Sequence, residues 1–551
     1  MSKKILIVGG VAGGASAACR LRRLDENAHI VMFERDEYIS FANCGLPYHI
    51  SEVIEKRNAL IVQTPAAMHR RFRIDIRNFS EVTAVDTAAK QVTVNSLEKG
   101  VYQEDYDVLV ISPGAEPFVP DFPGNDSQRI FTLRNLPDMD RIKAIVDHDK
   151  PASAVVVGGG FIGLEMAENL REKGIGVTLV EAADHVMPPL DGDMACILEK
   201  ELDKNGVKLV LGDGLKSITD EETASVVETV SGRKITAEMI ILAIGVRPAT
   251  AFLQGSGIEL GPKGHIIVDD QMRTNAADVY AVGDAVQVKD FVSGDDTAVP
   301  LAGPANKQGR IVADVICGLD AHYKATQGTS ILKAFGLTAA CTGLNERALK
   351  AKGIKYLKAC AHPFNHATYY PGATTIESKL LFDEKGTILG CQMVGRSGVD
   401  KRVDVIATVM RLGGNVRDLP ELELAYAPPF ASAKDPVNML GYIATNVLDG
   451  TSKLVDWEYA LNRDPETTIL LDVRTPQEYA AGHVEGAINI PVDDLRERLD
   501  ELDPDKEIIE YCKVGLRAHI AYRILANNGF DARNVTGGWM TYEQMNFKPQ
   551  N

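Results

Sequence analysis

The chain has 551 residues, of which 45% are hydrophobic and 25% are charged, and its formal net charge is −17. This length predicts three or four domains, and the acidic balance argues against nucleic acid as a partner, because binding to phosphate backbones requires a basic face. No stretch approaches the roughly 20 apolar residues of a membrane span, and the apolar run near the N-terminus is too short for a signal peptide. Eight dispersed cysteines without a C-x-x-C pair fit a reducing compartment, so we expect a cytoplasmic protein.

A nucleotide-binding fold is predicted at the N-terminus. An apolar strand over 4–8 leads into a glycine-rich turn over 9–14 and a helix over 15–24. Such a turn offers free amides and a helix N-terminus to a pyrophosphate. The next strand ends at Glu34, where a carboxylate is expected to hold a ribose hydroxyl pair. On a strict G-x-G-x-x-G frame the middle position is Val11, so this turn departs from the pattern.

A second nucleotide-binding fold follows about 150 residues later. The strand over 154–157 meets a complete G-x-G-x-x-G over 158–163, followed by a helix over 164–173. The next strand ends at Glu181, and a carboxylate there repels a 2′-phosphate, which favours NADH over NADPH. Two such folds in one chain predict one flavin and one nicotinamide.

Three further segments extend this region. Strands over 106–111 and 239–244 are expected to carry the chain from one nucleotide domain to the other, and the segment 279–285 places Asp284 at a strand end. In this order the segments resemble the flavoproteins with two dinucleotide-binding domains, over nearly all of residues 1–445. In that family an Asp at this position contacts the ribityl and pyrophosphate region of FAD.

Cys44 lies in the segment 40–48, directly after the first nucleotide fold. A single redox cysteine must form a mixed disulfide, a sulfenic acid or a persulfide with an external partner. A helix N-terminus or a nearby flavin would lower its pKa and make it a reactive thiolate. The string S-F-x-N-C-x-L-P-Y resembles the single-cysteine branch of the flavoprotein disulfide reductases, which comprises NADH oxidase, NADH peroxidase and coenzyme A-disulfide reductase.

Coenzyme A binding distinguishes the members of that branch. The basic groups that could bind its 3′-phospho-ADP end are Arg20, Arg22 and Arg23 on the first predicted helix and Arg70, Arg71 and Arg73 after the thiol segment. Arg20 and Arg23 share a helix face at i, i+3. The alternative is that these arginines are only solvated basic surface.

The resemblance also implies that two tyrosines from the partner subunit approach the substrate sulfur. Tyr426 is one of them, and the sequence does not decide between Tyr369 and Tyr370 for the other. If this holds, the enzyme is an obligate homodimer whose active site is completed in trans.

Residues 325–445 would form the dimerisation domain, which we expect to be a sheet with helices on one side. His362 and His366 are spaced by four residues, but the proline between them argues against a helix and no further ligand completes a metal site. We interpret both histidines as polar loop residues.

The C-terminal part differs in character. After a polar linker, Ile469–Val473 is a buried-looking strand, and a later strand delivers Cys512 into a short loop with Gly515 before a helix. Such a loop surrounds a sulfur anion with backbone amides, and Lys513 and Arg517 add positive charge. The pattern D-V-R…E-x-x-x-G-H-x-x-G-A-x-N-I-P…C-x-x-G-x-R…G-G-W resembles a rhodanese domain over its whole length.

The predicted fold class is therefore α/β, with two Rossmann-like dinucleotide-binding domains for FAD and NADH, an α+β dimerisation domain and a C-terminal α/β rhodanese domain. The expected boundaries are 1–112 and 246–324 for FAD binding, 113–245 for NADH binding, 325–445 for dimerisation, 446–462 for a linker and 463–551 for the rhodanese domain.

This combination resembles the coenzyme A-disulfide reductase–rhodanese fusions, some of which are called NADH-dependent persulfide reductases. The resemblance implies reduction of coenzyme A persulfide or polysulfide through Cys44 with release of sulfide, while Cys512 carries sulfane sulfur. The alternatives are a coenzyme A-disulfide reductase with an accessory rhodanese domain, an NADH oxidase or peroxidase, and a rhodanese-like domain that only binds or senses. The sequence does not choose how sulfur moves between the two thiols.

The predicted site residues fall into four groups, and no metal ligands are among them. The catalytic group is Cys44, Cys512, Tyr369, Tyr370 and Tyr426. The cofactor-binding group is Gly9, Val11, Ala12, Gly14, Glu34, Arg35, Asn43, Pro113, Gly114, Arg134, Gly158, Gly160, Ile162, Gly163, Glu181, Gly245, Gly283, Asp284, Pro300, Leu301 and Ala302. The coenzyme A-binding group is Arg20, Arg23, Ser40, Asn43, Gln63 and Arg71, and the rhodanese loop group is Lys513, Gly515 and Arg517.

Overall fold

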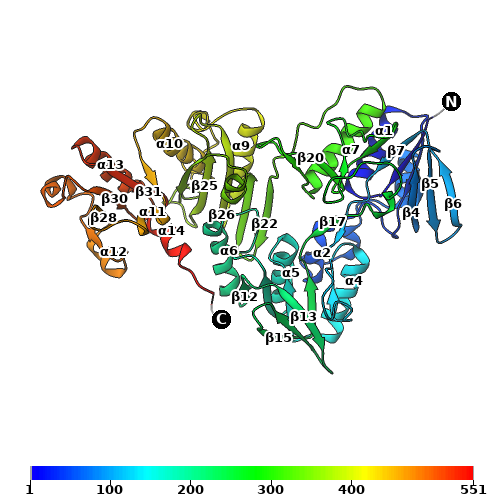
Figure 1. The fold of residues 1–551 in the computed structure, drawn as a ribbon, viewed down its shortest axis with the longest axis horizontal. Coiled ribbons are helices and arrows are strands. Elements are labelled where there is room, and N and C mark those ends of the chain that lie inside the picture. The colour runs from blue at the N-terminus through cyan, green and yellow to red at the C-terminus, as the bar shows by residue number, and fades with distance from the viewer. Residues whose placement is uncertain (1–2, 550–551) are drawn as a thin grey trace. The chain divides into compact units, whose positions relative to one another are not determined.

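The computed structural model describes residues 3–549 and divides into two compact units (Figure 1). The first unit comprises Met1–Ala182 and Asp213–Gly328, and the second comprises Ala183–Gly212 and Thr329–Asn551. Residues 183–212, which we expected within the NADH-binding domain, thus belong to the second unit. Over residues 3–549, no helix is long and apolar enough to cross a membrane.

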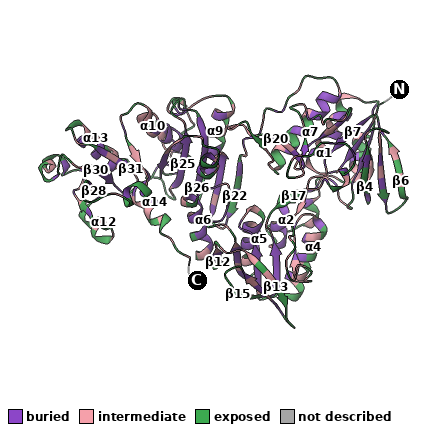
Figure 2. Cartoon of the chain, in the orientation of Figure 1, coloured by how far each residue is buried: buried purple, intermediate pink, exposed green. Residues whose placement is uncertain are grey.

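The first unit contains the predicted N-terminal nucleotide fold. Its parallel sheet has the order β19-β7-β1-β2-β3, and β1 and β7 are nearly continuous apolar runs because a parallel sheet is covered on both faces (Figure 2). Helix α1 begins at Ala12, three residues before the expected start, and packs against α7. The elements are β1 (Lys4–Val8), α1 (Ala12–Leu24), β2 (His29–Phe33), α2 (Leu46–Ile50), α3 (Pro65–Phe72), β3 (Asp75–Arg77), β7 (Val108–Ile111), β19 (Val279–Ala281) and α7 (Ala302–Ile316), with smaller sheets of β4 (Ser80–Asp86), β5 (Gln91–Ser96) and β6 (Gly100–Asp105), and of β18 (Ile266–Ile267), β20 (Val286–Lys289) and β21 (Asp296–Thr297).

The second nucleotide fold lies in the same unit. Strands β11, β10, β16 and β9 lie side by side in parallel, in that order. The two connections between the nucleotide folds run antiparallel to one another as β8 and β17, as expected for crossover segments. The elements are β8 (Ala115–Pro117), β9 (Ile130–Phe131), α4 (Leu136–Ala144), β10 (Ser153–Val157), α5 (Phe161–Glu172), β11 (Gly176–Glu181), β13 (Leu215–Asp220), β14 (Ser225–Thr229), β15 (Lys234–Ala237), β16 (Met239–Leu242) and β17 (Val246–Pro248).

The second unit begins with a five-stranded antiparallel sheet of order β22-β23-β26-β25-β24. Every residue of β25 and β26 is buried, so both faces of the sheet are covered at these two strands. Our expectation of helices on one side is therefore wrong. Helix α6 packs on β26 and β22, and it comes from residues remote in sequence, where no local pattern reveals the contact. The elements are α6 (Gly192–Lys204), β12 (Lys208–Leu211), β22 (Ser330–Ala334), β23 (Leu337–Gly343), α8 (Glu346–Ala351), β24 (Leu357–Ala361), β25 (Ile376–Phe382), β26 (Ile388–Gly395), α9 (Val399–Arg411) and α10 (Pro436–Leu448).

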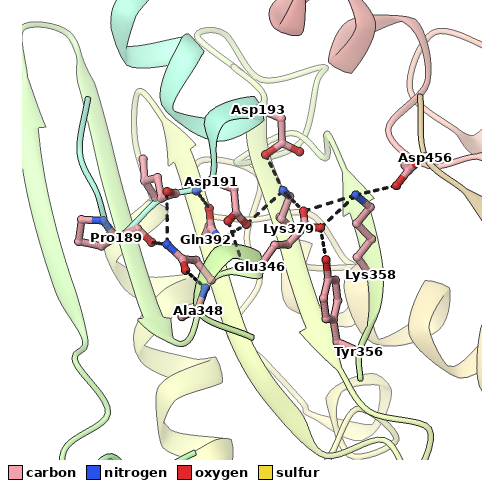
Figure 3. Close-up of polar contacts among 12 residues, drawn as sticks. Pro189, Asp191, Asp193, Glu346, Ala348, Tyr356, Lys358, Lys379, Gln392 and Asp456 are labelled. Carbon is pink, nitrogen blue, oxygen red and sulfur yellow. Dashed lines mark hydrogen bonds and ion pairs between the residues drawn. The ribbon is translucent and has the colours of Figure 1, made fainter. Parts of the chain in front are cut away.

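A buried charge cluster ties α6 and α8 to this sheet (Figure 3). Lys379 on β25 is fully buried, and its Nζ lies 3.3 Å from Asp191, 2.5 Å from Asp193 and 2.6 Å from Glu346. The ammonium is thus the cation that these carboxylates share. Burial alone would raise the pKa of Glu346, but Lys379 and Lys358 lower it to about 2.

The C-terminal part of the second unit is a parallel sheet of order β27-β31-β30-β28-β29. Strand β27 pairs with β31, and Trp457 at the start of α11 is buried in the core of this sheet. Residues 454–461 are therefore part of the folded domain, and the expected linker over 446–462 is wrong there. The elements are β27 (Leu454–Val455), α11 (Trp457–Leu461), β28 (Thr468–Asp472), α12 (Pro476–Ala481), β29 (Ala487–Asn489), β30 (Glu507–Tyr511), α13 (Leu516–Asn527), β31 (Ala532–Val535) and α14 (Gly538–Met545).

The two sheets of the second unit meet through buried polar contacts. Nε2 of His362 lies 2.9 Å from Oγ1 of Thr541 on α14, and its Nδ1 contacts the carboxylate of Glu377. Burial lowers the pKa of His362 to about 4. His366 is also buried and packs edge-on against Tyr370. Both histidines lie in the loop between β24 and β25, as expected, and neighbouring elements bury them there.

Candidate active site

Both nucleotide turns bring a helix start against the end of a strand. A Cβ on Gly14 would lie 1.9 Å from the carbonyl oxygen of Gly9, and one on Gly163 would lie 1.8 Å from that of Gly158. Only glycine permits this approach, which leaves the helix N-terminus open to a pyrophosphate. The departure at Val11 is tolerated because this residue, the N-cap of α1, has a φ of −96°, which suits any side chain.

The two carboxylates make matching contacts in the two folds. Oε2 of Glu34 accepts a hydrogen bond from the amide of Gly10 at 2.9 Å, and Oε2 of Glu181 accepts one from the amide of Gly159 at 2.5 Å. Each carboxylate is therefore fixed beside its glycine turn, where a ribose can be bound. Burial raises the pKa of Glu34.

Other predicted cofactor residues gather around the N-terminal turn. Nδ2 of Asn43 donates to the carbonyl of Arg134, whose guanidinium donates to the carbonyl of Pro113, both at 3.3 Å. Asp284 follows β19, and burial raises its pKa to about 6. The amide of Gly283 donates to Gln308 on α7 at 2.7 Å. Leu301 and Ala302 form the start of α7, with Pro300 immediately before them.

Cys44 lies in a 3-10 turn over Asn43–Gly45, just before α2, and the residue is exposed. We expected a helix N-terminus or a nearby flavin to lower its pKa. Within the chain, partial burial, and then the charges of Glu165 and Asp284, raise the pKa of Cys44. A helix of five residues supplies too small a dipole to outweigh two carboxylates.

Glu165 is a site residue that the sequence analysis missed. It lies in the first turn and a half of α5, and the hydroxyl of Tyr48 donates to its Oε1 at 3.4 Å. Burial raises the pKa of Glu165 to about 7. The only sequence signal is its position two residues after the last glycine of the second turn, so its approach to the Cys44 loop depends on the tertiary fold.

A hollow of about 290 Å³ lies between α1 and α7. Three of the residues predicted to bind coenzyme A line it, namely Arg20, Arg23 and Ser40, whereas Asn43, Gln63 and Arg71 are not among its lining residues. Residues missed by sequence reasoning are also present, including Arg310 and Asn306 on α7. No local sequence pattern could place these two residues beside α1, because α1 and α7 are almost 300 residues apart in the sequence.

The arginines of the first helix differ in role. Arg22 is buried, and its guanidinium donates to backbone carbonyls after α1 and at the end of α3. It therefore supports the fold and does not face a ligand. Arg20 donates to Asp314 at 2.7 Å, and Arg310 lies 3.8 Å from the same carboxylate. Arg23 has no such ion pair among residues 3–549, so the hollow keeps a positive excess.

The tyrosines predicted to approach the substrate are exposed in the second unit. The hydroxyls of Tyr369 and Tyr426 lie 2.7 Å apart, and these side chains are 74% and 48% exposed. Tyr370 instead packs against His366. Of the two alternatives, Tyr369 is thus the one that the structure pairs with Tyr426.

Cys512 follows β30 directly and is fully buried. The amide of Gly515 donates to its Sγ at 3.1 Å, and Gly515 has a φ of +103°, which a glycine adopts without strain. Arg517 pairs with Glu478 at 2.6 Å and also interacts with the Cys512 thiol. The carbonyl of Lys513 accepts from the amide of Met540 at 3.0 Å, which anchors the loop to α14.

Comparison with known proteins agrees with this arrangement. Residues 3–309 match the family model described as pyridine nucleotide-disulphide oxidoreductase, and residues 329–436 match the dimerisation domain of the same family. The chain belongs to the pyridine nucleotide-disulphide oxidoreductase family. Residues 455–545 match the rhodanese-like domain, so this oxidoreductase carries a further domain after its dimerisation domain.

Several relatives share all or part of this architecture. A coenzyme A disulfide reductase of Staphylococcus aureus is 37% identical over 445 residues, which cover 80% of this chain and 99% of the relative. The reduced Bacillus anthracis CoADR-RHD has a TM-score of 0.97 at 49% identity, covering 99% of this chain and 98% of that one. An NAD-dependent persulfide reductase from A. fulgidus has a TM-score of 0.92 at 34% identity, covering 98% and 100%.

Membership of this oxidoreductase family implies FAD and a nicotinamide cofactor, and the residues present fit both. The close-packed turns leave the helix starts free of Cβ atoms, and Glu34 and Glu181 lie where the two ribose groups are expected. Glu34 and Asp284 would hold FAD, and Glu181 with the turn 158–163 would hold the nicotinamide dinucleotide.

Proposed function

We propose that this chain is an NADH-dependent flavoprotein that reduces coenzyme A persulfide through Cys44 and releases sulfide, and that Cys512 carries sulfane sulfur. The observation that carries this proposal is an exposed single thiol on the loop whose Ser40 lines a hollow with Arg20, Arg23 and Arg310. A thiol on the loop that reaches an arginine-lined hollow suits a substrate with a sulfur at one end and phosphates at the other. The activities named for the Staphylococcus aureus and A. fulgidus relatives, coenzyme A disulfide reduction and persulfide reduction, support it.

The reaction at Cys44 is a thiol–disulfide exchange. The Cys44 thiolate attacks the sulfur bonded to coenzyme A, a new S–S bond forms, the persulfide S–S bond breaks, and hydrosulfide leaves. Attack on the outer sulfur instead would release coenzyme A thiolate and leave a persulfide on Cys44. Bound FAD would supply the two-electron link from NADH that reduces the resulting disulfide. In the first case the sum is coenzyme A persulfide, NADH and a proton giving coenzyme A, hydrogen sulfide and NAD⁺.

Glu165 fits a role in the protonation of this site. With a pKa of about 7, its carboxyl is partly protonated near neutral pH, and the charge that it carries when ionised opposes ionisation of Cys44. A neutral Glu165 therefore favours the thiolate, and its Oε1 accepts from Tyr48, which holds the group in place. Glu181 supports the preference for NADH, because its carboxylate repels a 2′-phosphate.

The rhodanese-like domain would supply the persulfide. The Gly515 amide and the Arg517 guanidinium stabilise a sulfur anion on Cys512. When the outer sulfur of a Cys512 persulfide is attacked by coenzyme A thiolate, the S–S bond to Cys512 breaks, Cys512 leaves as a thiolate, and coenzyme A persulfide forms. Polysulfide is a further acceptor that we propose for Cys44.

We further infer a homodimer in which Tyr369 and Tyr426 of one subunit complete the Cys44 site of the other. The matched dimerisation domain and the exposure of this hydrogen-bonded pair support it. We also propose a cytoplasmic location, because a reducing compartment keeps both reactive thiols available.

The test compares NADH oxidation with coenzyme A persulfide, coenzyme A disulfide, polysulfide and hydrogen peroxide, using wild type, Cys44→Ser and Cys512→Ser. We expect Cys44→Ser to lose persulfide reduction, and Cys512→Ser to keep activity on preformed coenzyme A persulfide but to lose activity that needs sulfur delivery. Persulfide reduction by Cys44→Ser, or peroxide as by far the best acceptor, would contradict the proposal.

Reduction of coenzyme A disulfide is a second candidate, because the Staphylococcus aureus relative aligns with the part of this chain that contains Cys44. In that case coenzyme A disulfide is the better acceptor in the same assay, and Cys512→Ser leaves every rate unchanged.

A further inference from the structure

A buried carboxyl group lies on the strand that delivers Cys512. Glu510 belongs to β30, two positions before Cys512, and is fully buried. Side chains alternate along a strand, so Glu510, Ile508 and Cys512 project from one face. Ile508 and Cys512 share a hydrophobic cluster with Ala521 of α13, which identifies that face as the one beneath α13 (Figure 1).

Neither carboxyl oxygen of Glu510 has a hydrogen-bond partner within residues 3–549. Its neighbour at the same register on β31 is Asn534, whose Oδ1 is also buried and without a partner. Ala532, two positions before Asn534, belongs to the same cluster as Ile508, so Glu510 and Asn534 lie on the same face. Adjacent strands are only about 4.8 Å apart. Two acceptor groups therefore meet in an apolar interior, and a single proton between them satisfies both.

Glu510 is in a state to supply that proton. Burial raises its pKa well above the ordinary value, and the nearby backbone amides of Glu510 and Arg533 offset this only in part. A protonated carboxyl can donate a hydrogen bond. It also places no second negative charge beside a sulfur anion on Cys512, where low dielectric strengthens repulsion.

Asn534 links this carboxyl to the loop. Its Nδ2 donates to the carbonyl of Gly515 at 3.5 Å, and the amide of Gly515 donates to Sγ of Cys512 at 3.1 Å. The orientation of the Asn534 amide therefore decides whether the Gly515 peptide is held, and that peptide presents its N–H to the sulfur.

We propose that Glu510 is a positioning residue for the sulfur-carrying loop: as a neutral carboxylic acid it donates a hydrogen bond to Oδ1 of Asn534, and Asn534 holds the Gly515 peptide against Cys512. The consequence for turnover rests on the proposed role of Cys512 as a sulfur carrier. The consequence for the reactivity of the Cys512 thiol does not.

The test uses the full-length holoenzyme with Glu510→Gln, Glu510→Met and Asn534→Leu. One readout is the pH dependence of iodoacetamide alkylation at Cys512, followed by mass spectrometry of its peptide, and the other is sulfur transfer from thiosulfate to cyanide. Gln keeps both the donor and the neutrality, so we expect both readouts to stay within about twofold of wild type. Met fills the space without a donor, and we expect about three- to tenfold slower alkylation and transfer, as for the loss of one hydrogen bond.

Asn534→Leu should match Glu510→Met, and the double variant should be no worse than either, because both substitutions break the same chain of contacts.

The proposal is overturned if Cys512 in Glu510→Met, with intact NADH-dependent activity at Cys44, is alkylated with the wild-type pH profile. It is also overturned if Glu510→Gln lowers the pKa of Cys512, since that is the effect of removing an ionised carboxylate. If Glu510→Met does not fold, Glu510→Gln and Asn534→Leu decide. If wild type transfers no sulfur but alkylation responds as expected, the sulfur-carrying role fails and the positioning inference stands.

Discussion

Cys44 shares its surroundings with two carboxyl groups that oppose its ionisation, and the charge of Glu165 raises the pKa of Cys44 more than that of Asp284. We expect Glu165→Gln to lower the pKa of the Cys44 thiol, because the substitution removes a negative charge and keeps the size of the side chain. The pH dependence of Cys44 alkylation in the holoenzyme measures this.

The matched control is Glu172→Gln, an exposed carboxylate on the same helix. It should leave the alkylation profile unchanged. A Glu165→Gln variant whose Cys44 titrates as in wild type would show that the carboxylate does not act on the thiol.

Glu181 is expected to determine the preference for NADH over NADPH. We expect Glu181→Ala to raise kcat/KM for NADPH relative to NADH by about tenfold, because the substitution removes a carboxylate that repels a 2′-phosphate. Parallel measurements with both nucleotides give the ratio. Asp184→Ala is the control, since the Asp184 side chain is 91% exposed. An unchanged ratio in Glu181→Ala would assign the nucleotide preference to other residues.

At the scale of elements, Lys379 connects α6, α8 and β25. Removing the ammonium leaves Asp191, Asp193 and Glu346 without the cation that they share. We therefore expect Lys379→Met to lower the free energy of unfolding of the second unit by about 3–5 kcal/mol, the usual cost of breaking a buried ion pair. Chemical denaturation followed by circular dichroism measures it, and Lys385→Met, an exposed lysine after β25, serves as the control.

The same cluster has a definite pH dependence. The folded-state pKa of Glu346 is lowered from 4.5 to about 2, so its stabilising contribution is fully present above the unfolded-state value and is lost as the pH falls through the folded-state value. In Lys379→Met this contribution should be largely absent, so the free energy of unfolding should fall less steeply between pH 4.5 and pH 2 than in wild type. Equal acid sensitivity of both proteins would show that Lys379 does not lower the pKa of Glu346.

Much of the architecture could be predicted because each nucleotide fold is encoded locally, as a strand, a glycine turn, a helix and a carboxylate within about 30 residues. The same is true of the loop from Cys512 to Arg517. Contacts between segments remote in sequence carry no local signal. Arg310 reaches the hollow only because α7 packs on α1, Glu165 reaches Cys44 only through the tertiary fold, and His362 is buried only because α14 covers it.

At the scale of the whole molecule, Cys44 belongs to the first unit and the Tyr369–Tyr426 pair to the second. If each active site takes its thiol from one subunit and its tyrosines from the other, two inactive variants can restore activity when they form a mixed dimer. The first variant is Cys44→Ser. The second is Tyr369→Phe with Tyr426→Phe, which removes both hydroxyls and keeps the rings.

Co-expression of the two variants with different affinity tags yields both homodimers and the mixed dimer. In the mixed dimer, one site has an intact thiol and intact tyrosines and the other site has neither. The purified mixed dimer should therefore reach about half of the wild-type rate of persulfide reduction, and a random mixture about a quarter, because half of its dimers are mixed in a two-fold symmetric assembly. Each homodimer alone should be nearly inactive. A mixed dimer as inactive as its parents would mean that the thiol and the tyrosines of one active site come from the same chain, because only then does every site in the mixed dimer lack one of them.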